Sequence, residues 1–540
     1  MSTADSEGHS GEFHRECAPH YCFGENRARI KCSSHSSYQT NLTFSRIPAL
    51  HTRKSNTFST MASARARFLQ RDVDLPSVSP EDIKALSTQL DDMNVIAKSI
   101  EKLKPHTVLI GEGSHGSSEY YTNRINLTKK LIEKGHCQAV MIEGDLPDTS
   151  DLHRFVMHHP SAKTLDEVFQ SFERFPSWMW ANEEMYKFVD WLYKYNKGRS
   201  SDKRVGIWGL DLYSMTLSMK RVLEYLEERD PEMANIVRAD YSCFGEIEPQ
   251  TYGILSQRGL LQGCHGAAMD ALAHVSAKRQ QYAKDAAMDT PGEASSESRS
   301  KKEKEKLDTI HAQDDAFITE LNAAVVVGAE EYYCAMFDPT RNSWNLRDTH
   351  FFKTLKQVQA HLKETRGGQG CACAWAHNSH LGDARATHLE QLRSRDLNLG
   401  QLVREAEPYP LSVNVGQLCW SGSVCAANDW GQEHQFKKIN KGLPGSHEDM
   451  LHQLTLQTGN TKFVLDIHNE KVAGALKEPR LQRAIGVIYR PDTERMSHYY
   501  KCDIVNQYDF VVFEDLTNPV TPLIPGEPPS LEPETFPTGL

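Results

Sequence analysis

The stretch Thr107-Val108-Leu109-Ile110-Gly111-Glu112-Gly113-Ser114-His115-Gly116 decides how this chain is organised. A short apolar run ends abruptly in a glycine-rich turn that carries a carboxylate and an imidazole. A buried strand that ends in glycines and leads into a helix is the usual place for an α/β protein to hold its chemistry. The glycines permit positive φ angles and close backbone approach, so His115 could point into a crevice. On these residues alone, a surface histidine at a strand–turn–helix corner is equally consistent.

Three later apolar runs end in the same way. Residues 139–142 lead into Glu143, residues 205–208 into Gly209-Leu210-Asp211, and residues 371–375 into a turn with two histidines. Helical patterns separate these runs, which predicts an α/β fold with a mostly parallel sheet flanked by helices. Parallel strands place their carboxyl ends at one edge, where ligands bind. The predicted site therefore gathers Glu112, His115, Glu143, Asp211, His377 and His380.

Further elements fill the rest of the chain. Helices are expected over 80–90, 92–102, 119–133 and 316–335, and from Asn345 onward. Additional strands are expected at 411–415, 463–467, 485–489 and 510–513.

The chain is expected to hold one large α/β domain over 72–520. Residues 1–70 lack helical or strand periodicity and are predicted to be a disordered extension. Residues from about 275 to 312 are polar and of low complexity, which predicts a flexible, solvated insert between two helices. Residues 521–540 are predicted to be an irregular tail.

Composition excludes several classes of protein. The 540 residues are 39% hydrophobic and carry a net charge of −11, which argues against a nucleic-acid binder. No run approaches the length of a membrane span. Cys137, Cys334, Cys371 and Cys373 lie in apolar surroundings, as buried free thiols in a reducing compartment would. We therefore expect a cytoplasmic protein; the basic, acid-free stretch 27–71 leaves a mitochondrial location as the alternative.

Three chemistries remain for the predicted site. A serine nucleophile would need Gly-x-Ser-x-Gly, and the sequence around Ser114 lacks the first glycine. A divalent metal could be held by His115, His377, His380 and Glu143. The third chemistry is general-base catalysis on water, in which a histidine takes the proton and Glu112 or Glu143 orients the ring. Arg124 or a second imidazole would then hold the developing oxyanion.

Six blocks of sequence carry a resemblance to a known family. They are Gly111-Glu112-Gly113-Ser114-His115-Gly116 with Arg124, Glu143 after the second strand, Gly209-Leu210-Asp211, Asn345-Leu346-Arg347-Asp348, Trp375-Ala376-His377-Asn378-Ser379-His380, and 483–491 with 497–499 and 507–509. In this order they resemble the erythromycin esterase family, over roughly 75–515.

The resemblance implies roles for these residues. His115 would be the general base that activates water, with Glu112, Arg124, Glu143, His377 and His380 as the other active-site residues. Asp211, Asn345 and Arg347 are the expected substrate-binding residues. The family's fold implies a helical region that forms a cleft over the strand ends.

The function expected from these observations is hydrolysis of carboxylic esters, including cyclic esters, on a small-molecule substrate and without a cofactor. Relatives built on the same Gly-Glu-x-x-His corner leave an alternative open. In that alternative the same His and Glu cluster serves a metal- or haem-binding protein or a metal-dependent hydrolase.

Overall fold

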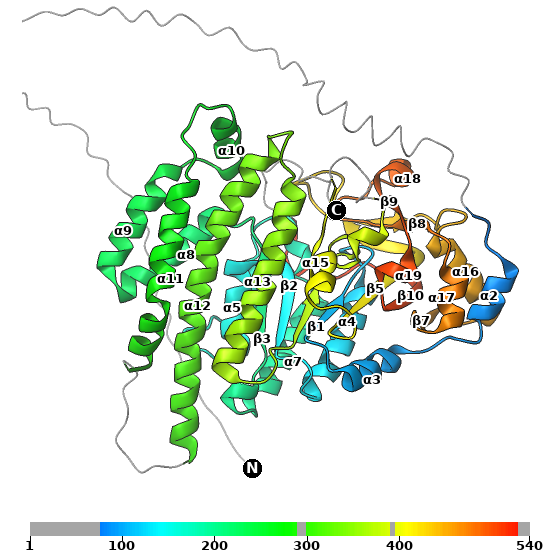
Figure 1. Cartoon of the computed structure of the whole chain (residues 1–540), viewed down its shortest axis with the longest axis horizontal. Helices are drawn as coiled ribbons and strands as arrows, with labels where there is room; N and C mark the ends of the chain where they lie inside the picture. The colour runs from blue at the N-terminus through cyan, green and yellow to red at the C-terminus, as the bar shows by residue number, and fades with distance from the viewer. Residues whose placement is uncertain (1–75, 289–298, 389–394, 527–540) are drawn as a thin grey trace, which may run out of the picture. The chain divides into compact units, whose positions relative to one another are not determined.

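A computed structural model describes residues 76–288, 299–388 and 395–526, and its centre is an eight-stranded sheet. The strand order is β3-β2-β4-β1-β5-β10-β7, with β6 paired to β5 (Figure 1). The neighbours from β3 to β10 are parallel, whereas β7 and β6 are antiparallel to their partners. The strands are β1 Thr107–Ile110, β2 Ala139–Asp145, β3 Gly206–Asp211, β4 Ala372–Trp375, β5 Ser412–Ala426, β6 Gln435–Ile439, β7 Lys462–Asp466 and β10 Phe510–Thr517. The predicted mostly parallel sheet is confirmed.

Strands β1 and β4 end level with one another, and their neighbours β2 and β5 continue beyond that level. Ile110 of β1 lies opposite Trp375 of β4 and Val415 of β5, and Ile142 of β2 also lies opposite Trp375. Because the strands are parallel and in this register, the turns that follow β1, β2 and β4 come to the same edge of the sheet. This register brings Glu112, Glu143 and His377 together.

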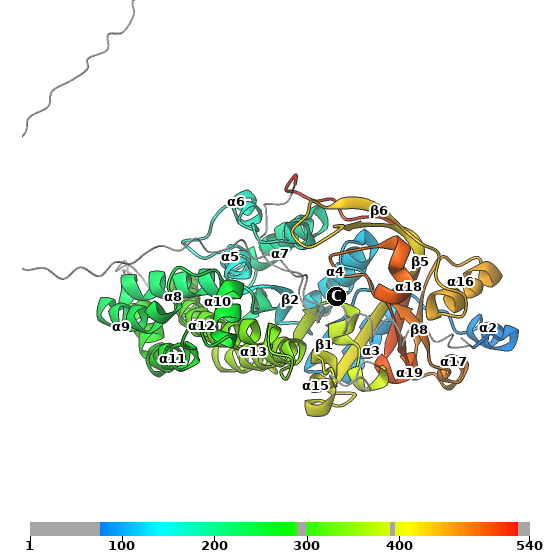
Figure 2. The same ribbon diagram turned by 90° about the horizontal axis from the view of Figure 1, so that it is seen from above.

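Helices cover both faces of the sheet, as Figure 2 shows from above. Val108 and Ile110 point into a core that includes α4 (Ser118–Glu133) and α7 (Glu183–Lys197). Leu109 points the other way, against α12 (Arg299–Met336) and α13 (Ser343–Arg366). Since successive strand residues face opposite sides, a strand buried on both faces reads as a continuous apolar run.

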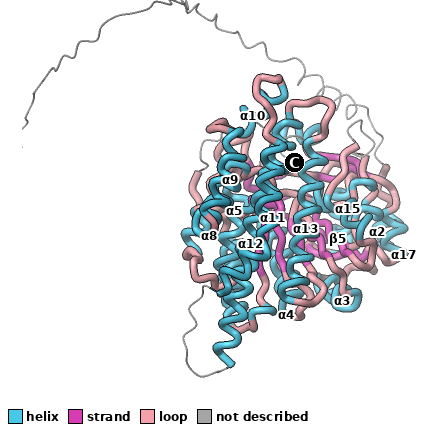
Figure 3. Tube along the Cα trace, turned by 60° about the vertical axis from the view of Figure 1, so that its left-hand side comes forward, coloured by secondary structure: helices cyan, strands magenta, loops and turns pink. Residues whose placement is uncertain are grey.

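A helical region, α8 to α12, gathers at the β3 edge of the sheet, and Figure 3 shows its long helices beside α13. At the opposite edge, α2, α16 and α17 pack near β7. The other helices are α2 Pro80–Leu86, α3 Met93–Leu103, α5 Leu146–Val156, α6 Leu165–Gln170, α8 Met215–Arg229, α9 Pro231–Tyr241, α10 Pro249–Gln257, α11 His265–Met288, α14 Asn378–Leu381, α15 Leu399–Ala406, α16 His447–Thr458, α17 Glu470–Leu476, α18 Glu494–Ser497 and α19 Ile504–Gln507. Among the described helices, none combines the length and apolarity that a membrane crossing requires.

The glycines after β1 are needed for close packing. A Cβ on Gly111 would lie 2.1 Å from Asn378 Oδ1, and one on Gly116 would lie 1.9 Å from the carbonyl oxygen of Cys425. None of the three glycines of this corner has a positive φ, so that part of the expectation was wrong. Their role is to let neighbouring strand ends approach the turn, which holds it in place.

Two expectations about secondary structure need correction. The polar stretch 275–312 is mostly helical, because α11 extends to Met288 and α12 begins at Arg299; only 289–298 lie outside the described residues. Residues 485–489 form no strand of the sheet and make only isolated bridges, from Ile485 to Ser114 and from Ile488 to Ala427. A separate two-stranded sheet pairs β8 (Arg480–Arg483) with β9 (Tyr499–Cys502).

The cysteines and chain ends complete the description. Cys137, Cys334, Cys371 and Cys373 are buried and free, as expected, whereas Cys243 and Cys264 form a disulfide. The predictions for residues 1–70 and 27–71 fall outside the described residues, as does the tail from 527 onward. The described part of that tail is anchored, since the 3-residue segment 521–523 hydrogen-bonds to the chain at 181–183.

Candidate active site

A buried chain of three polar side chains, His115, Glu112 and Arg124, begins at the glycine corner. His115 Nδ1 lies 3.0 Å from Glu112 Oε1, and Arg124 Nη1 lies 2.9 Å from the other carboxylate oxygen. Glu112 and Arg124 are fully buried and His115 is 2% exposed. A carboxylate on Nδ1 makes that nitrogen the protonated one, so Nε2 of His115 carries the free lone pair.

Aromatic rings surround the buried guanidinium of Arg124. Its Cζ lies 3.8 Å from the ring centroid of Tyr121, 5.0 Å from Trp180 and 5.2 Å from Trp375. Ring faces attract a cation, and this attraction strengthens where water is excluded. The rings and the Glu112 carboxylate together compensate a charge that burial would otherwise make costly.

Glu143 connects the second strand end to the fourth. Its Oε2 accepts a hydrogen bond from the backbone N–H of His377 at 2.9 Å, and its Oε1 accepts one from Arg347 Nη2 at 2.9 Å. Burial alone would raise the pKa of Glu143, but the cationic forms of His380 and His115 and the Arg347 charge hold it well below its usual range. Glu143 is therefore a carboxylate at neutral pH.

The two histidines after β4 differ in charge. Burial lowers the pKa of His377 well below its usual value, and neighbouring His115 adds to the effect. The ring of His377 lies 4.9 Å from the ring of His115, between centroids. Burial also acts against protonation of His380, but Asp348 and Glu143 outweigh it and raise its pKa to about 9. His377 is thus neutral and His380 cationic at pH 7.

Arg347 contacts Glu143, Asp211 and His380 and so connects the polar cluster at the strand ends. It donates to Asp211 through Nε at 2.9 Å and Nη2 at 2.6 Å, and its Nη1 lies 3.0 Å from His380 Nε2. Asp348, the next residue, holds the opposite ring nitrogen of His380 at 2.9 Å. Asp348 and Glu143 therefore hold the two ring nitrogens of His380, and Glu143 also balances the charge of the neighbouring Arg347.

These strand ends form the floor of a small cleft, of about 50 Å³. His115, Glu143, Asp211 and Arg347 are the predicted site residues that line it. The other walls come from the end of β2, the start of α5, the segment between α6 and α7, and two distant loops. They are Gly144, Asp145, Asp148, Phe172, Arg174, Pro176, Met179, Trp180, Tyr213, Trp430 and Val487.

Comparison with known proteins agrees with this arrangement. Residues 132–517 match the sequence model of the erythromycin esterase family. The chain belongs to the erythromycin esterase family. As a member of this family it is an esterase-like hydrolase. The match includes Glu143, Arg347 and both histidines of the fourth strand end, and it begins after the glycine corner that carries His115.

Solved structures share the fold. A succinoglycan biosynthesis protein is 16% identical, with coverage of 82% of this chain and 98% of that one and a TM-score of 0.59. A Bacillus cereus protein is also 16% identical, with coverage of 83% and 100% and a TM-score of 0.61. A mutant of the erythromycin esterase EreC in its open conformation is 14% identical, with coverage of 79% and 95% and a TM-score of 0.48.

In this esterase-family chain, the other predicted residues lie outside the cleft lining. Glu112, Arg124, His377 and His380 are buried directly behind it. Asn345 does not line the cleft either. Its side-chain oxygen accepts a hydrogen bond from Leu397 N at 2.9 Å, and its side-chain nitrogen donates to the carbonyl oxygen of Arg395. Among the described residues, none from the expected cleft-forming helical region α8 to α12 lines this cleft, whereas α13 contributes Arg347.

Sequence reasoning missed several residues of the cleft in this esterase-family chain. Asp145 and Asp148 follow Glu143 directly, so their position after a strand end was a usable signal. Tyr213 follows the strand end at Asp211 and shares that signal, whereas Arg174 and Trp430 come from irregular segments without periodicity, and nothing in the sequence marks them. They reach the site only through tertiary packing, such as the contact of Trp430 with Phe175 at 5.0 Å between ring centroids.

The histidine and glutamate cluster does not fit a metal ion. Within the described ranges no group of three His, Cys, Asp or Glu side chains is arranged to hold one. The reason is visible in the contacts: Asp348 and Glu143 flank the two nitrogens of His380, and the Arg347 guanidinium occupies the space beside Glu143. The Arg347 guanidinium is thus already paired with Glu143, at the position that a metal ion bound by this carboxylate would take.

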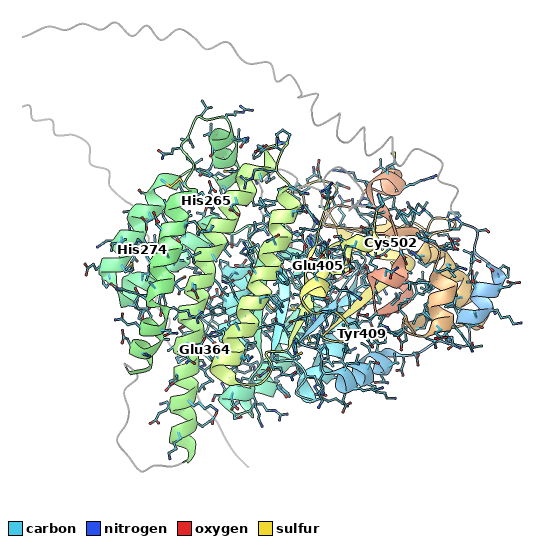
Figure 4. The ribbon with its side chains drawn as sticks, in the orientation of Figure 1. His265, His274, Glu364, Glu405, Tyr409 and Cys502 are labelled. Atoms are coloured by element: carbon cyan, nitrogen blue, oxygen red, sulfur yellow. A yellow bond between two sulfur atoms is a disulfide. The ribbon has the colours of Figure 1, made fainter. Side chains whose placement is uncertain are left out.

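A larger cavity lies away from this chemistry. It measures about 770 Å³, and its lining includes Arg385, Arg404, Tyr409, Lys501 and Cys502. Tyr409 and Cys502 are labelled in Figure 4 and lie near α15 and α19. None of the predicted site residues lines it, so we place the active site at the smaller cleft, where the charged groups converge.

Proposed function

We propose that this enzyme hydrolyses carboxylic esters by direct attack of water, with His115 Nε2 as the general base. The supporting observation is that His115 lines the cleft while Glu112 holds its Nδ1 at 3.0 Å. A histidine oriented by a carboxylate is the commonest general base for taking a proton from water in enzymes. The roles of the other residues follow from their charges.

Glu112 stabilises the imidazolium that forms when His115 accepts the proton, and Arg124 pairs with the other oxygen of Glu112 and holds the carboxylate in place. Arg347 lines the cleft and is the cation that faces the oxyanion formed when water adds to the ester carbonyl. Glu143, His377 and His380 set the position of Arg347 and of the base. Asp211 anchors the same guanidinium from the other side.

The substrate class is a small-molecule ester, and cyclic esters belong to it. One water needs about 10–15 Å³ of cavity volume on this measure, so a space of about 50 Å³ has room for only a few non-hydrogen atoms. The cleft therefore receives the ester bond and the attacking water, and the rest of the substrate extends past its rim of Phe172, Trp180 and Trp430. The same volume has no room for a haem.

The test is a hydrolysis assay of the purified full chain against alkyl esters, aryl esters and lactones, with and without a chelator. We expect turnover of at least one ester class, unchanged by the chelator, because the base is an imidazole that acts without a metal. Turnover abolished by the chelator and restored by a divalent metal would refute the proposed mechanism. Absence of turnover across the panel would refute the proposed function.

A further inference from the structure

Four carboxyl side chains line the cleft, and one of them differs from the others. Glu143 and Asp211 are paired with Arg347, and Asp145 is paired with Arg174. Asp148, on the first turn of α5, makes no side-chain hydrogen bond or ion pair with the part of the chain that the structure describes, yet it is only 7% exposed. A buried carboxyl without a partner is costly if charged.

The surroundings of Asp148 favour its neutral form. Burial is the largest influence, and the nearby Asp145 and Asp151 add to it, so the pKa of Asp148 rises to about 8. The charged groups that oppose this rise are Arg174, from the segment after α6, and Arg221, from α8. The N-terminus of α5 also favours the anion, but burial and the neighbouring carboxylates outweigh it. Asp148 is therefore a proton donor at neutral pH.

We propose that Asp148 is a catalytic general acid that protonates the leaving alcohol oxygen of the ester. This assignment rests on the proposed esterase function. Asp148 and His115 line the same cleft, of about 50 Å³, so a group bound there contacts both walls. An unpaired carboxylic O–H that lines the cleft is free to donate to a group bound there, whereas Glu143, Asp211 and Asp145 are engaged by arginines.

The reaction has two chemical steps. Water forms a bond to the ester carbonyl carbon while His115 Nε2 takes one of its protons. The tetrahedral intermediate then collapses: the bond from carbon to the alkoxy oxygen breaks, its electron pair stays on that oxygen, and the Asp148 proton moves to it. The products are a carboxylic acid and an alcohol. Transfer of a proton from the His115 imidazolium through solvent to the Asp148 carboxylate restores the enzyme.

The experiment compares two esters of the same acid in Asp148→Asn and in the parent enzyme. An ethyl ester has a leaving group that needs a proton, whereas a 4-nitrophenyl ester has one that leaves as an anion. We expect kcat/KM for the ethyl ester to fall by roughly 10²–10⁴-fold and that for the 4-nitrophenyl ester to stay nearly unchanged. The matched control is Asp151→Asn on the same helix, which is 5% exposed, pairs with Lys163 and Arg221, and does not line the cleft.

A second measurement is the pH profile. Ethyl ester turnover by the parent should decline above pH about 8, where Asp148 loses its proton, and this decline should be missing in Asp148→Asn. Equal losses on both esters, matched by the Asp151 control, would mean a structural role and overturn the proposal. No loss on either ester would also overturn it, while a large loss in His115→Ala on both esters would leave the esterase proposal standing.

Discussion

Glu112 Oε1 lies 3.0 Å from His115 Nδ1, three residues apart in the chain, and the pair is almost completely removed from solvent. The turn between them is held by two backbone hydrogen bonds, from His115 N to Ile485 O and from Ile485 N to Gly113 O. A segment near the C-terminus thus fixes the geometry of the N-terminal corner. The orientation of the base is a property of the fold as a whole.

The carboxylate of Glu112 should be essential for the action of His115 as the general base. In Glu112→Gln the shape is kept, but the charge is lost and the amide can donate to Nδ1, which would place the ring proton on Nε2. We expect kcat/KM to fall by roughly 10²–10⁴-fold on any ester that the parent hydrolyses. Glu133→Gln, on the exposed end of α4, is the control and should behave as the parent.

Arg124 should contribute mainly to stability, since it is fully buried and pairs with Glu112. Arg124→Met leaves the carboxylate uncompensated, which should lower the free energy of unfolding by about 3–5 kcal/mol in chemical denaturation. In the double variant with Glu112→Gln the loss should be smaller than the sum of the single losses, because the buried charge is gone. Strict additivity would show that the two groups do not interact.

Close packing at the glycine corner predicts intolerance of a single methyl group. Gly116→Ala would place Cβ 1.9 Å from the Cys425 carbonyl oxygen, so the corner must shift and the melting temperature should drop by several degrees. Gly474→Ala is the matched control. Gly474 is exposed on α17 with nothing near its Cβ position, and alanine there should be neutral or slightly stabilising. Equal melting temperatures for the two variants would contradict the packing argument.

The positive charge on His380 should stabilise the fold at low pH, and this stabilisation should be lost as the pH rises. Its pKa is raised from 6.5 to about 9 in the fold, so its contribution is complete below pH 6.5 and is lost as the pH rises through 9. The difference in unfolding free energy between the parent and His380→Gln should therefore shrink by about 3 kcal/mol across that window. Urea denaturation at pH 6, 7.5 and 9 measures it, and a constant difference would show that His380 is neutral throughout.

Much of the fold could be predicted because its strands are short and buried on both faces. The runs that became β1, β2, β3 and β4 read as continuous apolar segments, and their polar ends marked the site before any geometry was known. The order of the strands could not be predicted. β4 lies between β1 and β2, and only that insertion places His377 beside Glu143.

The residues that could not be predicted from the sequence lie in the walls of the cleft. Trp430 and Arg174 lie in irregular segments, where neither a hydrophobic period nor a motif indicates which way a side chain points. The polar stretch near 275–312 was misjudged for a related reason: a solvated helix surface has the composition of a loop, and packing of α11 against α12 decides between them.

The central claim is that Nε2 of His115 takes the proton from the attacking water. The most direct test is kcat/KM of His115→Ala on the best ester of the panel, beside His274→Ala, whose histidine lies on the outer helix α11 (Figure 4) with 41% of its side chain exposed. We predict a fall of roughly 10²–10⁴-fold for His115→Ala with the fold intact, and no change for the control. Hydrolysis by His115→Ala at the parent rate would contradict the account.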